Sequence, residues 1–511
     1  MSERSRRNFL KTAGGMLLSS GIVSPVKGLP STLAPEGEQG QTKRPNILLL
    51  FPDQHRFDWL GTNPHLPVRT PNLDKLGQRG VRFTHVLTPS PLCAPARACL
   101  ASGKAYTRCG VPSNGVDYPL DEPTFYSMLR ASGYWVAGCG KLDLNKPDRN
   151  TGVDGKYHLK EWGFSDGINC LGKGDAVSSG RTAPHDPYMA YLYRKHLAKL
   201  YIQDMEKRAG GTNPGGGSGR TYGSTWPSPL PEDAYCDNWI GRCGLELMRR
   251  SPKGKPWFLM VNFAGPHNPE DVTRDMWNRW KGVNFPPPNG ADGYSQEINN
   301  AIRRNYSAMV ENLDRWVGIY LQELEKRGEL ENTLVVYSSD HGEMLGDHNH
   351  WAKQVPYQPS VSVPLILSGP GVQRGVVSDA LVSTMDLAAT SLDYAGVPRP
   401  ADMDSRSLRP VLEGATQTHR EVLSSRLGPW SLSFDGRYKL IRGFDPDGKS
   451  IWQNRRDEHR FLKPADGPLL LFDLETDPGE NLNLAQKPGS EGRKLSSVFH
   501  DEMNANLGSD T

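Results

Sequence analysis

The sequence predicts an α/β fold in which helices cover both faces of a large, mostly parallel sheet. Three observations support this fold. Continuous apolar runs alternate with helical patterns over most of the chain, the pattern becomes one of short alternating runs after about residue 420, and the length is 511 residues. A chain of this length that is 36% hydrophobic can form one large core and a smaller appendage.

The expected strands of the large sheet are apolar without a break, which is typical of parallel strands buried on both faces. They cover residues 46–51, 134–137, 257–263, 333–338 and 364–367. Helical patterns lie between them at 124–131, 296–327 and 384–394. This alternation is what predicts a sheet sandwiched by helices.

We expect three parts along the chain: a leader at 1–40, an α/β catalytic domain at 41–420 and a small antiparallel subdomain at 421–511. The last part contains the short runs 431–434, 438–442 and 469–473, separated by Gly, Asp and Pro. The segments 210–233 and 285–293 are predicted to be loops. With 54 Gly and 41 Pro in the chain, we expect loops on the scaffold to carry function.

The leader has the pattern of a twin-arginine export signal, since Arg6 and Arg7 precede Phe9, Leu10 and a short, weakly apolar run. This predicts export by the twin-arginine translocase and a periplasmic or secreted protein. A basic disordered terminus is the alternative. No other stretch approaches the roughly 18 apolar residues that span a bilayer, so we expect no membrane span in the mature protein.

Charge and cysteine content exclude other classes. The formal net charge is +3, and residues 1–30 hold five basic residues against one acidic, which leaves about −1 for the rest. The chain therefore lacks the overall excess of positive charge that would indicate a nucleic-acid partner. The seven cysteines are an odd number, and twin-arginine substrates fold before export in a reducing cytosol. This route weakens the usual expectation of disulfides in an exported protein and leaves their presence open, and the odd number indicates one cysteine with a separate role.

Chemically active residues follow four of the predicted strands, at the edge where open α/β sheets form sites. These residues are Asp53-Gln54, Gly140-Lys141, Pro266-His267 and Asp340-His341-Gly342-Glu343. A fifth segment, Cys93-Ala94-Pro95-Ala96-Arg97, precedes a helix-like stretch whose backbone N–H groups favour an anion.

The Cys-x-Pro-x-Arg core of that segment resembles the sulfatase signature, and the other segments match the family pattern in order over about residues 45–485. Lys353 and the runs 363–371 and 471–482 extend the match. The resemblance implies an alkaline phosphatase-like fold and a sulfuric ester hydrolase. Within the family, residues 140–143 and 337–343 are most similar to arylsulfatase K, a glucuronate 2-sulfatase.

In this family the cysteine is oxidised to formylglycine, so the resemblance implies a formylglycine-generating or sulfatase-maturating enzyme acting on Cys93. A hydrated aldehyde carries two hydroxyls on one carbon. One attacks sulfur and displaces the alcohol, and the other then expels sulfate. The alternative for Cys93 is an inert buried thiol.

The family match also implies a divalent cation bound by Asp53, Gln54, Asp340 and His341. Oxygen ligands suit Ca²⁺ or Mg²⁺, and the imidazole leaves Mn²⁺ open. Such a cation lowers the pKa of a formylglycine hydroxyl and holds a sulfate oxygen. Many sulfatases have two adjacent aspartates where this chain has Asp53-Gln54, which leaves the metal's identity open. The alternative for the Asp340-His341 pair is a hydrogen-bonded turn.

The remaining catalytic roles are implied by the same resemblance. Arg97 would hold the formylglycine, Lys141 and Lys353 would neutralise the sulfate, and His267 would protonate the leaving oxygen. Asp143 stands where many sulfatases carry a histidine, so it either replaces that histidine as the base that expels sulfate or orients Lys141.

The substrate is expected to be a sulfated small molecule or sugar, such as a uronate 2-sulfate. Cations in a long insertion could meet a second anionic group; they are Lys156, Arg181, Arg194 and Lys195. Two other functions stay open. One is a phosphonate monoester hydrolase or phosphodiesterase of the same superfamily, and the other is a binding protein that keeps the fold without turnover.

Overall fold

The structure is a computed structural model that describes residues 44–210, 222–290, 293–446 and 467–486. The predicted leader at 1–40 lies outside these residues, as do parts of the two predicted loops and of the C-terminal subdomain. The division of the chain at residues 41 and 421 stays a prediction.

The core is an eight-stranded sheet with the order β5-β4-β6-β1-β7-β8-β2-β9. Strands β5, β4, β6, β1 and β7 run parallel to one another, as the uninterrupted apolar runs predict. The strands are β1 (Asn46–Leu50), β2 (Val81–Phe83), β4 (Trp135–Gly140), β5 (Asp166–Asn169), β6 (Trp257–Asn262), β7 (Thr333–Tyr337), β8 (Leu365–Ser368) and β9 (Val376–Ser378).

One expectation about this sheet is wrong. The run at 364–367 was expected to be parallel, but β8 pairs antiparallel with both β7 and β2. All four residues of β8 are buried. A continuous apolar run indicates burial on both faces and carries no information about strand direction, which depends on the path of the connecting chain.

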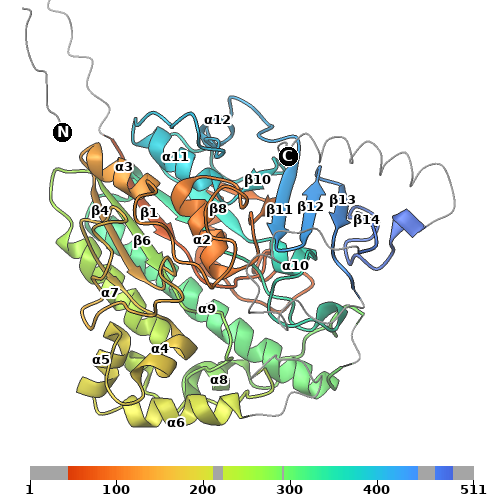
Figure 1. The fold of residues 1–511 in the computed structure, drawn as a ribbon, viewed down its shortest axis with the longest axis horizontal. Coiled ribbons are helices and arrows are strands. Elements are labelled where there is room, and N and C mark those ends of the chain that lie inside the picture. Colours follow the sequence, from red (N-terminus) through yellow and green to blue (C-terminus); the bar gives the residue numbers. More distant parts are fainter. Residues whose placement is uncertain (1–43, 211–221, 291–292, 447–466, 487–511) are drawn as a thin grey trace, which may run out of the picture. The chain divides into compact units, whose positions relative to one another are not determined.

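Helices cover both faces of the sheet (Figure 1). Residues Ile47 and Leu49 of β1 belong to a hydrophobic cluster with α2, α3 and α11, whereas Leu48 and Leu50 face a second cluster with α1, α7 and α9. The helices are α1 (Pro71–Arg79), α2 (Cys93–Ser102), α3 (Phe125–Ala131), α4 (Lys173–Gly180), α5 (Pro187–Arg194), α6 (Ala198–Ala209), α7 (Cys236–Arg250), α8 (Arg274–Trp280), α9 (Gln296–Lys326), α10 (Gln358–Val361), α11 (Asp386–Tyr394) and α12 (Arg409–Leu412).

A separate four-stranded antiparallel sheet follows, as the short alternating runs predict. Its strands are β11 (Leu423–Leu427), β12 (Trp430–Phe434), β13 (Tyr438–Arg442) and β14 (Leu470–Asp473). A two-stranded parallel sheet joins β3 (Val86–Leu87) to β10 (Val382–Ser383). Among the described residues, no helix combines the length and apolarity that crossing a membrane requires.

Candidate active site

The polar residues that follow β1, β4, β6 and β7 meet at one edge of the large sheet. The backbone N–H of Asp53 donates to the carbonyls of Phe263 and Gly265, and that of Lys141 donates to the carbonyl of Asn262 at 2.9 Å. These bonds tie the ends of three parallel strands together. The segments that the sequence places after successive strands therefore form one site.

Cys93 is the first residue of α2 and is buried. Its Sγ lies 3.4 Å from Nε2 of His341, and the next backbone N–H, that of Ala94, donates to Asn114. Burial and Asp53 raise the pKa of the Cys93 thiol, but Lys141, Lys353 and His341 outweigh them and lower it to about 6. A helix N-terminus and nearby cations favour an anion at this position.

Asp53, Cys93, Asp340 and His341 form a buried cluster in which one ligand atom from each side chain lies within 4.8 Å of the others. The Nδ1 of His341 lies 3.1 Å from the carbonyl of Gly342 and donates to it, so Nε2 is the ring nitrogen that faces the carboxylates. That nitrogen lies 3.7 Å from Oδ1 of Asp53 and 3.6 Å from Oδ2 of Asp340.

The donor set fits a divalent cation because one buried oxygen has no partner. Oδ1 of Asp53 accepts no hydrogen bond from the described residues, although the side chain is fully buried. Burial raises the pKa of Asp53, but nearby cations, Lys141 foremost, hold it well below its usual range. A buried, ionised oxygen beside an imidazole nitrogen has the chemistry that a divalent cation requires of its ligands.

Gln54 is held so that its amide oxygen faces the site. Its backbone has φ 73°, and its N–H donates to Oδ1 of Asp340 at 3.0 Å. Its Nε2 donates to Oε2 of Glu343, and its Oε1 accepts from Nζ of Lys353. Because Glu343 accepts only from the amide nitrogen, the oxygen must point the other way, toward Lys353 and the cluster.

Glu343 is a site residue to which sequence reasoning assigned no role. Its Oε2 also accepts from the hydroxyl of Tyr222 at 2.8 Å, and its Oε1 accepts from the backbone of Leu345 and Ala352 at 3.0 and 2.7 Å. The carboxylate thus joins Gln54 to the loop that carries Lys353. Its place in the Asp340-His341-Gly342-Glu343 segment was the only signal in the sequence.

Arg97 links three segments of the site. Its Nε donates to Oδ2 of Asp340 at 3.0 Å, and its Nη1 donates to the carbonyl of Lys141 at 2.7 Å and to Oδ1 of Asn262 at 2.9 Å. Burial lowers the pKa of Arg97, but Asp340 and Asp53 outweigh it and raise the pKa. The guanidinium therefore stays charged and rigid between both carboxylates. Asn262, which ends β6, is a second residue that the sequence analysis did not single out.

Lys141 lies between two carboxylates. Its Nζ donates to Oδ2 of Asp53 and lies 3.3 Å from Oδ2 of Asp143. Burial lowers the pKa of Lys141, but Asp143 and Asp53 raise it well above its usual value. Gly140 makes this position possible, because its φ is 86° and a Cβ there would lie 1.9 Å from the carbonyl oxygen of Asn262.

Asp143 is held between Lys141 and Lys146, whose Nζ lies 2.8 Å from Oδ2 of Asp143. Burial raises the pKa of Asp143, but Lys141, Lys146 and Arg97 lower it below its usual range. A carboxylate with a depressed pKa is a weak base. The geometry therefore favours the second of the two roles that the sequence left open, in which Asp143 orients Lys141.

His267 and Lys353 form a direct pair, with 2.7 Å between Nε2 and Nζ. The Nδ1 of His267 lies 2.6 Å from the carbonyl of Asn268, so Nδ1 donates and Nε2 accepts from Lys353. Burial and Lys353 hold the pKa of His267 well below its usual range. His267 is therefore neutral here, and a proton can reach it from Lys353.

The small antiparallel sheet supports the segment that follows Lys353. Nε1 of Trp430 donates to the carbonyl of Gln354 at 3.0 Å, and the buried Nζ of Lys439 donates to the carbonyl of Pro356 at 2.8 Å. Glu480 forms an ion pair with Lys439. The C-terminal region therefore helps to position Lys353 in the site.

His55, the neighbour of Gln54, and the cations of the predicted insertion lie outside the cluster. His55 binds Tyr337 and Trp59, and burial lowers its pKa to about 4, so it has a structural role. Of the insertion cations, Lys156 pairs with Asp166 and Arg181 with Glu206. Arg194 and Lys195 are exposed at the end of α5. All seven cysteines are free in the structure.

Known proteins share this sequence pattern and fold. The sulfatase family model matches residues 45–397. An arylsulfatase of Clostridium perfringens is 28% identical over 86% of this chain and 90% of its own. Human arylsulfatase K is 26% identical over 93% of this chain and 85% of its own.

Two solved structures show the same fold. A phosphonate monoester hydrolase of Agrobacterium radiobacter aligns with a TM-score of 0.72 at 22% identity, covering 90% of this chain and 95% of its own. A protein solved in complex with its substrate D-glucosamine-2-N,6-O-disulfate aligns with a TM-score of 0.68 at 21% identity. The alignment covers 92% of this chain and 99% of that protein's chain. The family match spans the whole large sheet and the whole cluster, and the chain is therefore a member of the sulfatase family and a sulfuric ester hydrolase.

Proposed function

We propose that this protein removes sulfate from a sulfated carbohydrate, with formylglycine at position 93 and one divalent cation held by Asp53, Gln54, Asp340 and His341. The observation that carries this proposal is the buried cluster around Cys93, with its unpartnered carboxylate oxygen and its ring of cations. Two carboxylates and an amide oxygen favour Ca²⁺, and the imidazole keeps Mn²⁺ in competition.

When present, the cation and the aldehyde hydrate supply a positive centre for a sulfate oxygen and a hydroxyl nucleophile. The side chains of the protein do the rest. Lys141 and Lys353 offset the negative charge of the transferring sulfate. The Lys353–His267 pair, joined at 2.7 Å, delivers a proton to the leaving oxygen through Nε2 of His267. Arg97 keeps Asp340 in place beside position 93.

A sugar substrate is supported by two relatives. The sequence resembles arylsulfatase K, and a protein of the same fold is named with a glucosamine disulfate as its substrate. We propose a uronate 2-sulfate as the first substrate to test. If simple aryl or choline sulfates are desulfated faster than every uronate 2-sulfate, the sugar assignment is wrong.

The reaction class is tested with matched aryl sulfate and aryl phosphonate esters. We expect the sulfate ester to have the higher kcat/KM, chelation to abolish turnover, and added Ca²⁺ or Mn²⁺ to restore it. A higher kcat/KM for the phosphonate would favour the activity named for the Agrobacterium structure. Full activity in a sample shown to be metal-free would contradict the cation site.

Maturation and export are part of the proposal. A formylglycine-generating or sulfatase-maturating enzyme would act on Cys93, and the twin-arginine translocase would carry the folded protein to the periplasm or beyond. Replacing Arg6 and Arg7 by Lys should retain the protein in the cytoplasm, measured by cell fractionation. Normal export of that variant would contradict the route.

A further inference from the structure

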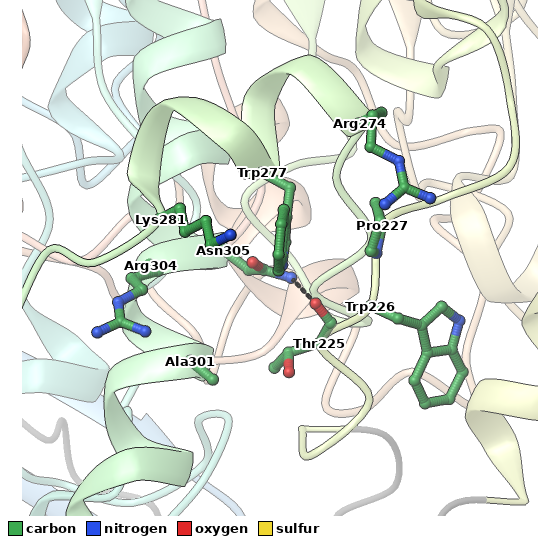
Figure 2. A pocket seen from close by; sticks show the side chains of 9 residues that line it. All are labelled: Thr225, Trp226, Pro227, Arg274, Trp277, Lys281, Ala301, Arg304 and Asn305. Atoms are coloured by element: carbon green, nitrogen blue, oxygen red, sulfur yellow. Dashed lines mark hydrogen bonds between the residues drawn. The ribbon is translucent and has the colours of Figure 1, made fainter.

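A second cavity lies outside the catalytic cluster, between α8, α9 and residues 225–227. Its volume is about 390 Å³, which is within the range of small-ligand pockets. We name it the Trp277 pocket. Figure 2 shows the ring of Trp277 at its centre, with Lys281 and Arg304 on one side and Arg274 on the other.

Among the residues that the structure describes, no carboxylate pairs with the cations of the Trp277 pocket. Within the described part of the chain, Arg274 and Lys281 form no ion pair, and Arg304 donates to the carbonyl of Val283 and to Oδ1 of Asn284. No acidic side chain lines the cavity. Another cation of α8 does have a carboxylate partner: Arg279 forms an ion pair with Glu311 of α9 at 3.2 Å. The pocket therefore holds a local excess of positive charge.

Trp277 supplies the apolar surface that a sugar ring requires. It is partly buried on α8, and Nζ of Lys281 lies 5.8 Å from its ring centroid. The other indole of the pocket, Trp226, is held elsewhere by a bond from its Nε1 to Asp204 at 2.9 Å. An aromatic face beside guanidinium and ammonium groups suits a ligand with an apolar ring face and anionic substituents.

The floor of the pocket is fixed and adjoins the support of the catalytic cluster. The buried Asn305 donates through Nδ2 to the carbonyls of Thr225 at 3.0 Å, drawn in Figure 2, and Glu270 at 2.7 Å. The next residue of α9, Tyr306, donates to the carbonyl of Gln54 at 2.6 Å. Successive residues of one helix thus contact the pocket and the metal-binding segment.

We propose that the Trp277 pocket is a second binding site for the carbohydrate, where a sulfate- or carboxylate-bearing sugar of the same polymer is held while another reaches the catalytic cluster. This proposal rests on the proposed function, because it assumes that the substrate is a sulfated carbohydrate. Trp277 stacks on a sugar ring, and Arg274, Lys281 and Arg304 bind its anionic groups.

The test uses affinity electrophoresis of Cys93→Ala protein, which leaves the polymer intact, through gels containing chondroitin sulfate or neutral dextran. We expect chondroitin sulfate to retard the protein and dextran to have no effect. Arg274→Gln/Lys281→Gln and Trp277→Ala should each weaken the apparent affinity about tenfold. The matched control is Lys253→Gln/Lys255→Gln, which removes two exposed charges outside the pocket and should leave the affinity unchanged.

Three results would overturn the proposal: no retardation of the parent, an equal loss in the control, or equal retardation by poly-glutamate that Trp277→Ala does not alter. Trp277→Tyr keeps an aromatic face and should restore binding, which separates stacking from misfolding. With Cys93 intact, the pocket variants should hydrolyse 4-nitrophenyl sulfate at the parental rate. That assay reports separately on the proposed function, because a parent inactive on every sulfate ester can still be retarded by the polymer.

Discussion

Asp53 and Asp386 are both fully buried, and the pKa of each is lowered by nearby cations against the effect of burial, yet the two regions use the carboxylate differently. Asp386 accepts from Nε2 of His419 at 3.0 Å, from Nε of Arg420 at 2.7 Å and from the N–H of Arg406 at 2.8 Å. Asp53 leaves Oδ1 without a donor. A lowered pKa therefore does not separate a structural carboxylate from a functional one, and what sets Asp53 apart from Asp386 is the oxygen that no donor satisfies.

The largest expected effect separates these two aspartates. Asp53→Asn removes a cation ligand, so we expect kcat/KM to fall by about 10³-fold. Asp386→Asn leaves Arg420 buried without its partner, and we expect it to lower the free energy of unfolding by about 3 kcal/mol while the folded fraction keeps its kcat. Steady-state kinetics and urea unfolding measure the two effects. Loss of kcat in folded Asp386→Asn, or full activity in Asp53→Asn, would remove the distinction.

The next effect concerns Asp143, which lies 3.3 Å from Nζ of Lys141. If it orients Lys141, Asp143→Asn slows both the sulfuryl transfer and the later release of sulfate by about 10²-fold, without a burst of released alcohol. If it is the base that expels sulfate, the first step stays fast and a burst appears before slow turnover. Rapid-mixing assays with an aryl sulfate decide this, and because the lysines hold its pKa low we expect no burst.

Glu343 provides a smaller test of how the cluster is built. Glu343→Gln presents an amide to Nε2 of Gln54 and lets the Gln54 amide turn, so we expect cation affinity to fall by about 10–100-fold. Glu270→Gln is a matched control. Burial and Glu343 raise the pKa of Glu270 well above its usual range, which favours the protonated carboxyl that Gln resembles. Titration of chelated protein with Ca²⁺ measures both, and equal losses would show that Glu343 acts only through packing.

The smallest effect is an acid-dependent difference in stability. Burial raises the pKa of Asp386, but Arg420 and His419 lower it to about 2, below the unfolded value of about 4. The stabilisation from this group is therefore present above about pH 4 and is lost as the pH falls toward 2. The parent should lose about 2 kcal/mol more than Asp386→Asn over this window, measured by urea unfolding. Parallel loss in both proteins would contradict the assignment.

Much of the fold and site could be predicted from the sequence because both follow from local patterns. The apolar runs at 46–51, 257–263 and 333–338 became adjacent parallel strands, and the residues after them met at one sheet edge. The direction of β8 could not be predicted, since burial on both faces does not depend on it.

Features that depend on packing between distant segments could not be predicted from the sequence either. The orientation of the Gln54 amide depends on Glu343, and the Trp277 pocket depends on how residues 225–227 lie against α8 and α9. Neither contact leaves a periodicity or a spacing along the chain. The partners of Asp386, which are Arg420 and His419, likewise leave no pattern in the sequence, whereas Asp53 was identified by its place after the first strand.

The central claim is that position 93 works as an aldehyde beside the cation held by Asp53, Asp340 and His341. Mass spectrometry of the Cys93 peptide from an active preparation tests it most directly. We predict a peptide about 18 Da lighter than the thiol form that reacts with hydrazides, in a fraction that scales with sulfatase activity across preparations. An active preparation in which residue 93 is an unmodified thiol throughout would contradict the account.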